Sequence, residues 1–397
     1  MSEVLLLEGV RTPRGKAKPD GGLGAVSPLA LVESVLGAAL ERAGVAGDAV
    51  DEVVLGCASQ VDGQGANLAR TAVLTSGLPD AVPGITVNRF CSSGLDAVAV
   101  GVGLIASGQA DVVLAGGVES VSSVPMFTDR GPLWTDKDVI GRIGSVHMGI
   151  AADLVATEEG FTRAELDAYG ERTQRLALEA WERGDHQRSL VIPDGATITR
   201  DEHVRAGVSL EGLAGLPPAF AELGASGQDA LALEHVDGLE GIEHLHTRGT
   251  SPSVADGAAM TVLASPEAAH RLGVAPRARI AGTTSAGCDP VRMLLAGQIA
   301  VERALQRAGW GPQDLDVVEF AEAFSALCLR FQRDLGVEDD RFNPNGGTIA
   351  MGHAFGATGA ILLTGLVDEL ERRGARRGVA AVSGAAGSGA AVLVERS

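Results

Sequence analysis

Aromatic side chains are scarce in this chain, and positive charge is outweighed by negative charge. Phe, Trp and Tyr together make up 3% of the residues, with a single Tyr. Proteins that bind single-stranded nucleic acid stack the bases on aromatic side chains, and this composition offers few such platforms. A net charge of −19 also opposes binding to phosphate backbones and anionic membrane surfaces. We therefore expect no nucleic-acid partner and no membrane partner, although a local basic patch can still receive a phosphorylated ligand.

The cysteines lack the spacing of a disulfide framework or a metal site. They are Cys57, Cys91, Cys288 and Cys328. None belongs to a CxxC motif or to a Cys/His metal-binding pattern, so we expect free thiols in a reducing compartment and no structural metal. His244 and His246 form a His-x-His pair without a third ligand nearby in the sequence, and we interpret them as residues of a solvated loop.

No targeting or membrane-spanning segment is recognisable. The N-terminus, MSEVLLLE, is typical of a strand flanked by acidic residues and lacks the basic-then-apolar pattern of a signal sequence. We find no apolar run that approaches the roughly 20 residues of a membrane-spanning helix. The expected location is the cytoplasm.

The chain contains an internal duplication. With 397 residues it is longer than one ordinary core, so two halves are expected. Residues 40–55 and 305–320 both read as a helix that ends at Ala-Gly, a short acidic turn and a strand. Further along, residues 91–95 and 353–360 each begin a helix of small residues, followed by a strand and a glycine turn. If the two halves are pseudo-symmetric, Cys91 and His353 occupy equivalent helix starts and face each other.

The sequence around Cys91 is typical of a nucleophile. A β-branched segment, 84–88, precedes it and a helix-compatible segment, 92–100, follows it. A thiol at the first turn of a helix lies near the positive end of the helix dipole, so we expect its pKa to fall towards neutrality. Cys57 and Cys328 lack this setting and are interpreted as buried structural residues.

Several motifs in order along the whole chain resemble the thiolase family. They are Arg11-Thr12-Pro13, Asn88-Arg89-Phe90-Cys91-Ser92-Ser93-Gly94, Gly116-Gly117-Val118-Glu119-Ser120, His147-Met148-Gly149, Asp256-Gly257-Ala258-Ala259, Ser285-Ala286-Gly287 and Asn345-Gly346-Gly347-Thr348 through Gly352-His353. The resemblance implies an α/β protein with a duplicated five-layer α-β-α-β-α core and an inserted loop domain. The implied N-terminal half covers residues 1–120 and 251–274, the inserted domain 121–250, and the C-terminal half 275–397.

The resemblance also implies the chemistry. Cys91 would carry the acyl group, and His353 would activate that thiol and bind a thioester oxygen. Coenzyme A or acyl-CoA would be a substrate, with no permanently bound cofactor, and the protein would form a homodimer or homotetramer that acts in fatty acid metabolism. The residues implied to bind substrate or coenzyme A are His147, Met148, Phe220, Ser251, Ser253, Ala286, Gly287, Phe324 and Gly384.

The sequence departs from the family pattern at positions that carry function. The usual Asn-Glu-Ala-Phe motif reads Ala321-Glu322-Ala323-Phe324, so the asparagine that holds a water in the substrate-side oxyanion hole is missing. The second catalytic cysteine is replaced by Ser383. One acid/base group and one oxyanion donor are worth about 10²–10⁴ and 10²–10³ in rate, respectively. Ser383 acting through water, Glu322 and Cys288 are candidate replacements.

Three functions remain open. The leading one is an acyl-CoA C-acyltransferase that works through an acyl-Cys91 intermediate on acyl-CoA or 3-oxoacyl-CoA. The second is a thiolase-like enzyme that transfers the acyl group to a non-carbon nucleophile, or condenses a carrier-protein or malonyl thioester. The third is a non-catalytic subunit that binds thioesters.

Overall fold

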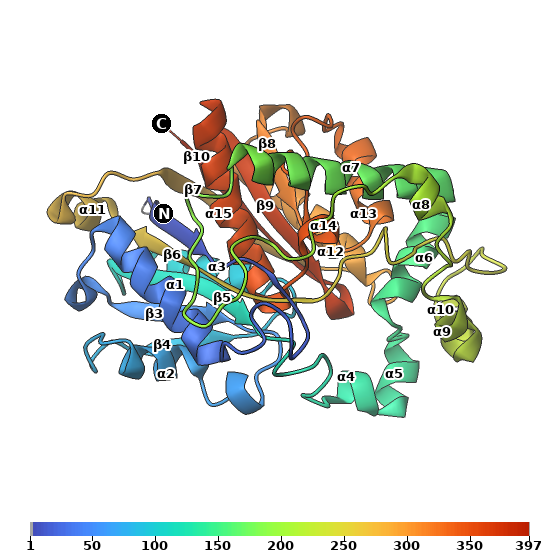
Figure 1. Cartoon of the computed structure of the whole chain (residues 1–397), viewed down its shortest axis with the longest axis horizontal. Helices are drawn as coiled ribbons and strands as arrows, with labels where there is room; N and C mark the ends of the chain where they lie inside the picture. The colour runs from blue at the N-terminus through green and yellow to red at the C-terminus, as the bar shows by residue number, and fades with distance from the viewer. Residues whose placement is uncertain (1–2, 397) are drawn as a thin grey trace.

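The computed structural model describes residues 3–396, which form ten strands in one connected sheet. The strand order is β4-β3-β5-β6-β1-β7-β10-β9-β8, with the short β2 paired to β6 (Figure 1). The strands are β1 (Leu5–Arg11), β2 (Gly15–Lys16), β3 (Glu52–Gly56), β4 (Gly84–Val87), β5 (Val112–Glu119), β6 (Ala255–Ala264), β7 (Ala278–Gly287), β8 (Val317–Phe320), β9 (Arg377–Gly384) and β10 (Ser388–Glu395).

The helices cover the strands and fill the space between the two halves. They are α1 (Pro28–Ala43), α2 (Leu68–Thr75), α3 (Ser93–Ala106), α4 (Pro132–Thr135), α5 (Lys137–Ile143), α6 (Met148–Glu159), α7 (Arg163–Arg183), α8 (Leu210–Ala214), α9 (Ala221–Leu223), α10 (Asp229–Leu233), α11 (Pro266–Leu272), α12 (Ala296–Ala308), α13 (Ser325–Leu335), α14 (Thr348–Met351) and α15 (Phe355–Arg373).

The duplication expected from the sequence is present. In the first half α1 is capped at its C-terminus by Gly44, which has a left-handed φ of 65°. A short 3-10 turn then leads into β3. In the second half α12 ends at Gly309, with φ 69°, and the same kind of turn leads into β8. Only glycine adopts this backbone without steric cost, which explains the Ala-Gly that ends both helices.

The two halves of the sheet are joined by a short contact. The strands β4-β3-β5-β6-β1 and β7-β10-β9-β8 form the two parts, and β1 pairs with β7 only at Leu5–Arg279 and Leu6–Ala278. The duplicated halves therefore meet edge to edge over two residue pairs. This junction leaves room for helices between the faces of the two parts.

Helices α3 and α15 form the central layer. One buried apolar cluster combines residues of α3 and α15 with strands of both halves. The two helices approach closely because small residues line the contact: a Cβ added to Gly94 of α3 would lie 2.7 Å from the carbonyl oxygen of Gly356 in α15. Outer layers are formed by α1 and α2 on the first half and by α12 and α13 on the second. The predicted α-β-α-β-α layering is confirmed.

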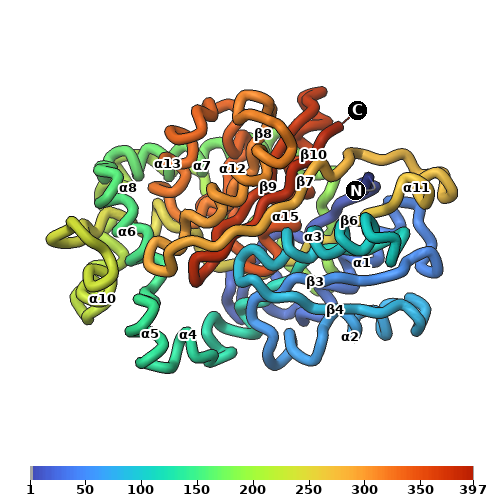
Figure 2. The backbone as a smooth tube through the Cα atoms, turned by 180° about the vertical axis from the view of Figure 1, so that it is seen from behind, coloured from blue at the N-terminus to red at the C-terminus, as the bar shows by residue number. Residues whose placement is uncertain are grey.

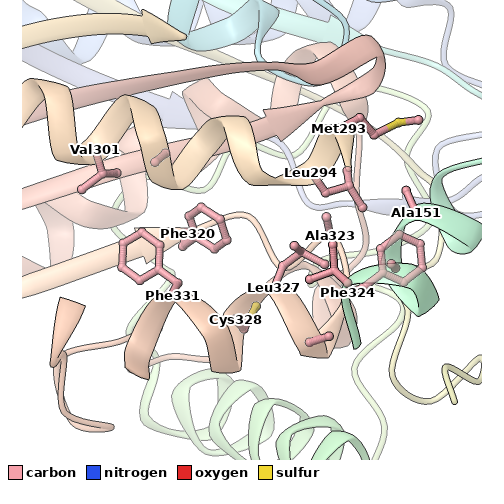
Figure 3. Close-up of a cluster of buried hydrophobic side chains, with 14 of the residues drawn as sticks. Ala151, Met293, Leu294, Val301, Phe320, Ala323, Phe324, Leu327, Cys328 and Phe331 are labelled. Carbon is pink, nitrogen blue, oxygen red and sulfur yellow. The ribbon is translucent and has the colours of Figure 1, made fainter. Parts of the chain in front are cut away.

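Aromatic and aliphatic side chains of the second half form the core beneath α12 and α13. Figure 3 shows Phe320 of β8 beside Phe331 and Cys328 of α13. The Phe320 and Phe331 ring centroids are 4.7 Å apart. Cys328 is completely buried, as is Cys57 in the first half, which agrees with a structural role for both thiols.

A long excursion separates β5 from β6 and contains α4 to α10. Its longest helix, α7, begins with a capping box in which Thr162 and Glu165 satisfy each other's backbone N–H groups. Figure 2, the view from behind, shows α4 and α5 on one side of this excursion and α10 on another. The boundaries 121–250 of an inserted domain remain a prediction.

One part of the excursion differs from expectation. The stretch Lys137–Glu159 is long and apolar enough to cross a membrane by length and composition. The statement that no apolar run approaches membrane-span length is therefore wrong. In the structure, however, α5 ends at Ile143 and α6 begins at Met148, and 56% of the apolar window is buried inside the protein. Most of α6 contributes to the core of the second half.

The His-x-His pair is also placed differently from the solvated loop that we expected. His246 is completely buried, and its Nδ1 lies 2.7 Å from Oδ1 of Asp153. His244 lies between two carboxylates, with its ring nitrogens 3.0 Å from Asp153 and 3.0 Å from Asp229. The pair therefore anchors its loop to α6 through the buried Asp153. No group of three or more His, Cys, Asp or Glu residues within 3–396 is arranged to hold a metal ion.

We expect His244→Gln to destabilise the protein more at pH 6 than at pH 9. Burial opposes protonation of His244, but its hydrogen bonds to Asp153 and Asp229 outweigh burial and raise its pKa. A raised folded-state pKa gives stability that is complete below the unfolded value of about 6.5 and is lost as the pH rises through the folded value. Urea unfolding at both pH values measures the difference. Equal losses of unfolding free energy at the two pH values would contradict this role.

Candidate active site

Cys91 lies in the turn that connects β4 to α3. Phe90 has a positive φ of 50°, and the helix begins two residues after Cys91, at Ser93. The turn is held by Ser93, whose hydroxyl accepts from the N–H of Arg89 at 2.8 Å and donates to the carbonyl of Phe90 at 2.6 Å. The thiol is thus fixed just before the first turn of α3.

His353 occupies the equivalent position before α15, which begins at Phe355. Its backbone N–H donates to the carbonyl of Ser253 at 2.8 Å. Its Nδ1 lies 2.8 Å from Oγ1 of Thr358, one turn into the helix. These contacts fix the imidazole. Its other ring nitrogen, Nε2, has no hydrogen bond within residues 3–396.

One cavity of about 240 Å³ brings both side chains together. Its lining also contains six of the residues that the sequence suggested: His147, Met148, Phe220, Ser251, Phe324 and Ser383. The remaining wall is largely apolar, with residues such as Leu294, Val254 and Phe355. A mostly apolar chamber with a few convergent polar groups is typical of a small-molecule site.

Other suggested residues are not part of this lining. Ser253 contributes only its carbonyl, to His353, and Ala286 and Gly287 lie at the end of β7. Gly384 lies close to Cys91: a Cβ added to it would be 3.4 Å from the Cys91 nitrogen and 2.9 Å from the Ser388 hydroxyl oxygen.

The Cys91 thiol is less acidic than the sequence led us to expect. Burial, followed by the negative charge of Glu119, raises the pKa of Cys91 to about 12, although the N–H groups of Ala385 and of Cys91 itself favour the thiolate. The expected fall towards neutrality is wrong, because desolvation of the thiolate outweighs the helix dipole. The resting thiol is protonated at neutral pH.

His353 is suited to receive that proton. Burial lowers the pKa of His353 to about 4, and the positive charge of Arg14 contributes in the same direction. The imidazole is therefore neutral at pH 7 and carries a free lone pair. When a protonated thiol and a neutral imidazole share a cavity, the imidazole can accept the proton of the thiol as the sulfur attacks a substrate.

Two buried charged residues that the sequence did not single out support this pair. Glu119, at the end of β5, accepts the backbone N–H groups of Ala58 and Gly356 at 2.9 Å each, and so ties the start of α15 to the first half. Arg14 donates to the carbonyl of Gly352, directly before His353, at 3.3 Å. Both residues stand in or beside motifs noted in the sequence, but only the fold brings them close to Cys91 and His353.

None of the candidate replacements for the missing base is free. The Ser383 hydroxyl lines the cavity but donates to the carbonyl of Leu294 at 2.7 Å and accepts from the N–H of Gly297 at 3.0 Å. The Glu322 carboxylate is fully buried outside the cavity lining, where it accepts from Tyr169 at 2.8 Å and from Thr173 at 2.9 Å.

Cys288 is also outside the lining of both cavities that contain Cys91. Its sulfur lies 3.4 Å from the carbonyl of Met293, and burial raises the pKa of its thiol. Ala321, at the place of the missing asparagine, is buried and offers only a methyl group. Two imidazoles, His147 and His353, share the cavity with Cys91, and neither has a hydrogen bond at Nε2 within residues 3–396.

Cys91 also lines a second, smaller cavity of about 40 Å³. It shares Met126, Met148 and Phe355 with the main cavity, and Phe90, Phe127 and Trp134 add an aromatic wall. Trp134 packs edge-on against Phe127, with ring centroids 4.8 Å apart. Cys91 thus contributes to the lining of two neighbouring cavities.

Comparisons with known proteins agree with the motifs and the fold. The thiolase N-terminal domain model matches residues 4–227, and the thiolase C-terminal domain model matches residues 274–396. The chain is 37% identical to a beta-ketoadipyl-CoA thiolase of Pseudomonas knackmussii over 99% of both chains, and 36% identical to an acetyl-CoA acetyltransferase of Cupriavidus necator over 100% of both. The crystal structure of the Bacillus anthracis acetyl-CoA acetyltransferase superposes with a TM-score of 0.84 at 33% identity, covering 100% of this chain and 99% of that one. The chain belongs to the thiolase family.

Proposed function

We propose that this protein is an acyl-CoA C-acyltransferase that carries the acyl group on Cys91. The observation that supports this most directly is the shared cavity, in which a protonated thiol and a neutral imidazole occupy equivalent helix starts of the two halves. Full-length similarity to proteins named as acetyl-CoA acetyltransferases and thiolases supports the same reaction class. The roles proposed for single residues rest on the geometry of this site.

In the forward step His353 takes the proton of Cys91 as the sulfur attacks a carbonyl carbon. With a 3-oxoacyl-CoA, the new bond forms between sulfur and C3, the C2–C3 bond breaks, and its electron pair becomes the enolate of the departing acyl-CoA. The imidazolium of His353 then returns the proton to C2. In the second step His353 removes the proton of an incoming CoA thiol, which attacks the acyl-Cys91 thioester and releases the free enzyme.

This scheme uses one acid/base group for every proton transfer. Family members with a second catalytic cysteine divide these tasks, whereas the Ser383 hydroxyl here is engaged with Leu294 and Gly297. The scheme needs no bound cofactor, because coenzyme A enters as a substrate. Ser251, a cavity residue whose hydroxyl has no hydrogen-bond partner in residues 3–396, is a suitable contact for the polar arm of the thioester.

Mass spectrometry of the intact protein tests the acyl-enzyme. After incubation with acetyl-CoA or acetoacetyl-CoA, we expect an added mass of one acetyl group that maps to Cys91 and disappears in Cys91→Ala. No adduct in the wild type, or an adduct that survives the substitution, would reject this function and favour a subunit that only binds thioesters.

A second function is favoured by the loss of two family groups, Asn at position 321 and Cys at position 383. A decarboxylating condensation generates its own carbanion and needs no base to remove an α-proton, so a malonyl or carrier-protein thioester would suit this site. Transfer of the acyl group to a non-carbon nucleophile also avoids that base. Thiolysis of acetoacetyl-CoA measured beside malonyl-thioester condensation separates the candidates, and efficient thiolysis would reject the second.

We expect Ser383→Cys to increase exchange of the α-proton of acetyl-CoA with solvent. A thiol is far more acidic than a hydroxyl and binds the Leu294 carbonyl more weakly, so it can act as the missing base. An added base is worth about 10²–10⁴ in rate, and we expect a gain of about tenfold or more because the surrounding contacts are tuned for oxygen. Deuterium incorporation followed by NMR measures it, with Ser383→Ala as the control that adds no base. Equal exchange in both variants would show that α-proton removal does not limit this enzyme.

The free edge of the sheet supports a homodimer. Strand β4 pairs with β3 on one side, and within residues 3–396 no strand pairs with its other side. Ile85 on this strand and Leu74 on the adjoining α2 are 45% and 52% exposed. An exposed apolar edge strand readily pairs with another chain. The four free cysteines support a cytoplasmic location.

Light scattering coupled to size exclusion tests the dimer. We expect Ile85→Lys to shift the protein to monomer, because a charge on the edge strand opposes pairing, while Ile192→Lys, at another exposed apolar residue, leaves the mass unchanged. A wild-type monomer would reject the proposal.

A further inference from the structure

His147 holds one ring nitrogen in a fixed hydrogen bond. It is the N-cap residue of α6, and its Nδ1 accepts the backbone N–H of Gly149 at 3.0 Å. An N–H group can only donate, so Nδ1 must be the unprotonated nitrogen. In the neutral imidazole the proton then lies on Nε2. The helix cap therefore fixes the tautomer of this histidine.

The protonated nitrogen has no hydrogen-bond partner within residues 3–396, and its ring lies at the wall of the cavity. His147 lines the chamber that contains Cys91 and His353, and no hydrogen bond of Nε2 is present within residues 3–396. The ring packs against Phe220, with centroids 5.5 Å apart, so it is held at the wall. Burial lowers the pKa of His147, which keeps the ring neutral at pH 7. The residue is thus a preorganised donor that cannot serve as a base, because its only free nitrogen already carries a proton.

Two other groups that could donate to a substrate oxygen are missing or engaged. Ala321 replaces the asparagine that family members use to hold an oxyanion-binding water, and the Ser383 proton is committed to the Leu294 carbonyl. A donor aimed at developing negative charge is worth about 10²–10³ in rate. A site that has lost one such donor needs another.

We propose that Nε2–H of His147 donates a hydrogen bond to the thioester oxygen of the CoA substrate and stabilises the enolate formed when the C2–C3 bond breaks. This inference rests on the proposed function. His147 transfers no proton: the electron pair moves from the breaking bond onto the enolate, the oxygen accepts the hydrogen bond from Nε2–H, and His353 delivers the proton to C2. His147 therefore has a catalytic role in addition to contact with the substrate.

Two substitutions separate the donor from the helix cap. In His147→Asn the side-chain oxygen reaches the position of Nδ1 and still caps α6, but no group reaches the position of Nε2. In His147→Gln the amide nitrogen reaches the position of Nε2, while the cap at Nδ1 is lost. Asn is a strong N-cap, so the Asn variant keeps the start of α6 and the Gln variant loses its cap.

We expect the two variants to rank in opposite orders for rate and for stability. The Asn variant should lose about 10²-fold in kcat for acetoacetyl-CoA thiolysis with little change in KM, and should unfold near the wild-type temperature. The Gln variant should retain most of kcat and unfold at a lower temperature. Steady-state kinetics and thermal unfolding measure both.

A purely structural role would give the same order in both measurements. Retention of kcat by the Asn variant, or equal loss of kcat in both variants, would overturn the donor role. Acyl-Cys91 formation in the wild type is measured first, by intact mass. If the wild type forms no adduct, the proposed function fails; if it forms the adduct and the two variants do not rank as expected, only the role of His147 fails.

Discussion

Replacing Cys91 by alanine should lower thiolysis by about 10⁴-fold or more, because the covalent route disappears and the cavity lining within residues 3–396 contains no other thiol. Ser383 shares that cavity but has its hydroxyl engaged with Leu294 and Gly297. Cys288 is excluded by its place outside the lining. Turnover of acetoacetyl-CoA with saturating CoA measures the loss.

The fold should tolerate this change. Cys91 is a small residue that borders two cavities, so removal of the sulfur enlarges an existing space and leaves no buried polar group unpaired. Thermal unfolding within a few degrees of the wild type is the control. Substantial turnover by a folded Cys91→Ala variant would exclude acyl transfer through this thiol.

Replacing His353 by glutamine should lower kcat/KM at pH 7 by about 10²–10⁴-fold and should change its dependence on pH. In the wild type, the active pair is the protonated thiol with the neutral imidazole. The pKa of His353 is lowered to about 4 and that of Cys91 is raised to about 12, so the rate should be nearly constant between these limits. It should fall when the pH drops towards 4, because His353 becomes protonated and cannot accept the Cys91 proton.

The variant should instead respond to the fraction of thiolate. Without a base, Cys91 reacts only when ionised, and below a pKa of about 12 that fraction rises tenfold per pH unit. Iodoacetamide modification and acyl-enzyme formation, each followed from pH 6 to pH 9, give the two profiles, and Thr358→Val controls for the contact at Nδ1. A wild-type profile that climbs tenfold per unit would show that His353 does not activate Cys91.

The sequence was informative where local patterns repeat. Two helices that end at Ala-Gly, each followed by a turn and a strand, predicted the duplication, and the motif around Cys91 predicted a strand, a turn and a helix start. These features depend on periodicity, caps and glycine turns, which act over a few residues.

Predictions that depended on the environment of a group were less successful. The Cys91 pKa was expected to fall because the helix dipole is readable from the sequence, whereas the opposing desolvation comes from elements distant in the chain. His244 and His246 were expected in a solvated loop because their partners, Asp153 and Asp229, cannot be inferred from spacing.

The sequence by itself determined the family, the layered α/β architecture and the two residues at equivalent helix starts, because each is encoded in contiguous motifs and in their order. Only the tertiary structure decided which groups are free to react. It engaged the hydroxyl of Ser383 and the carboxylate of Glu322 in structural hydrogen bonds, and it placed His147 in the cavity wall with no hydrogen bond at Nε2 within residues 3–396. Burial and hydrogen-bond partners set reactivity, and both arise from segments that the fold brings together from distant parts of the chain.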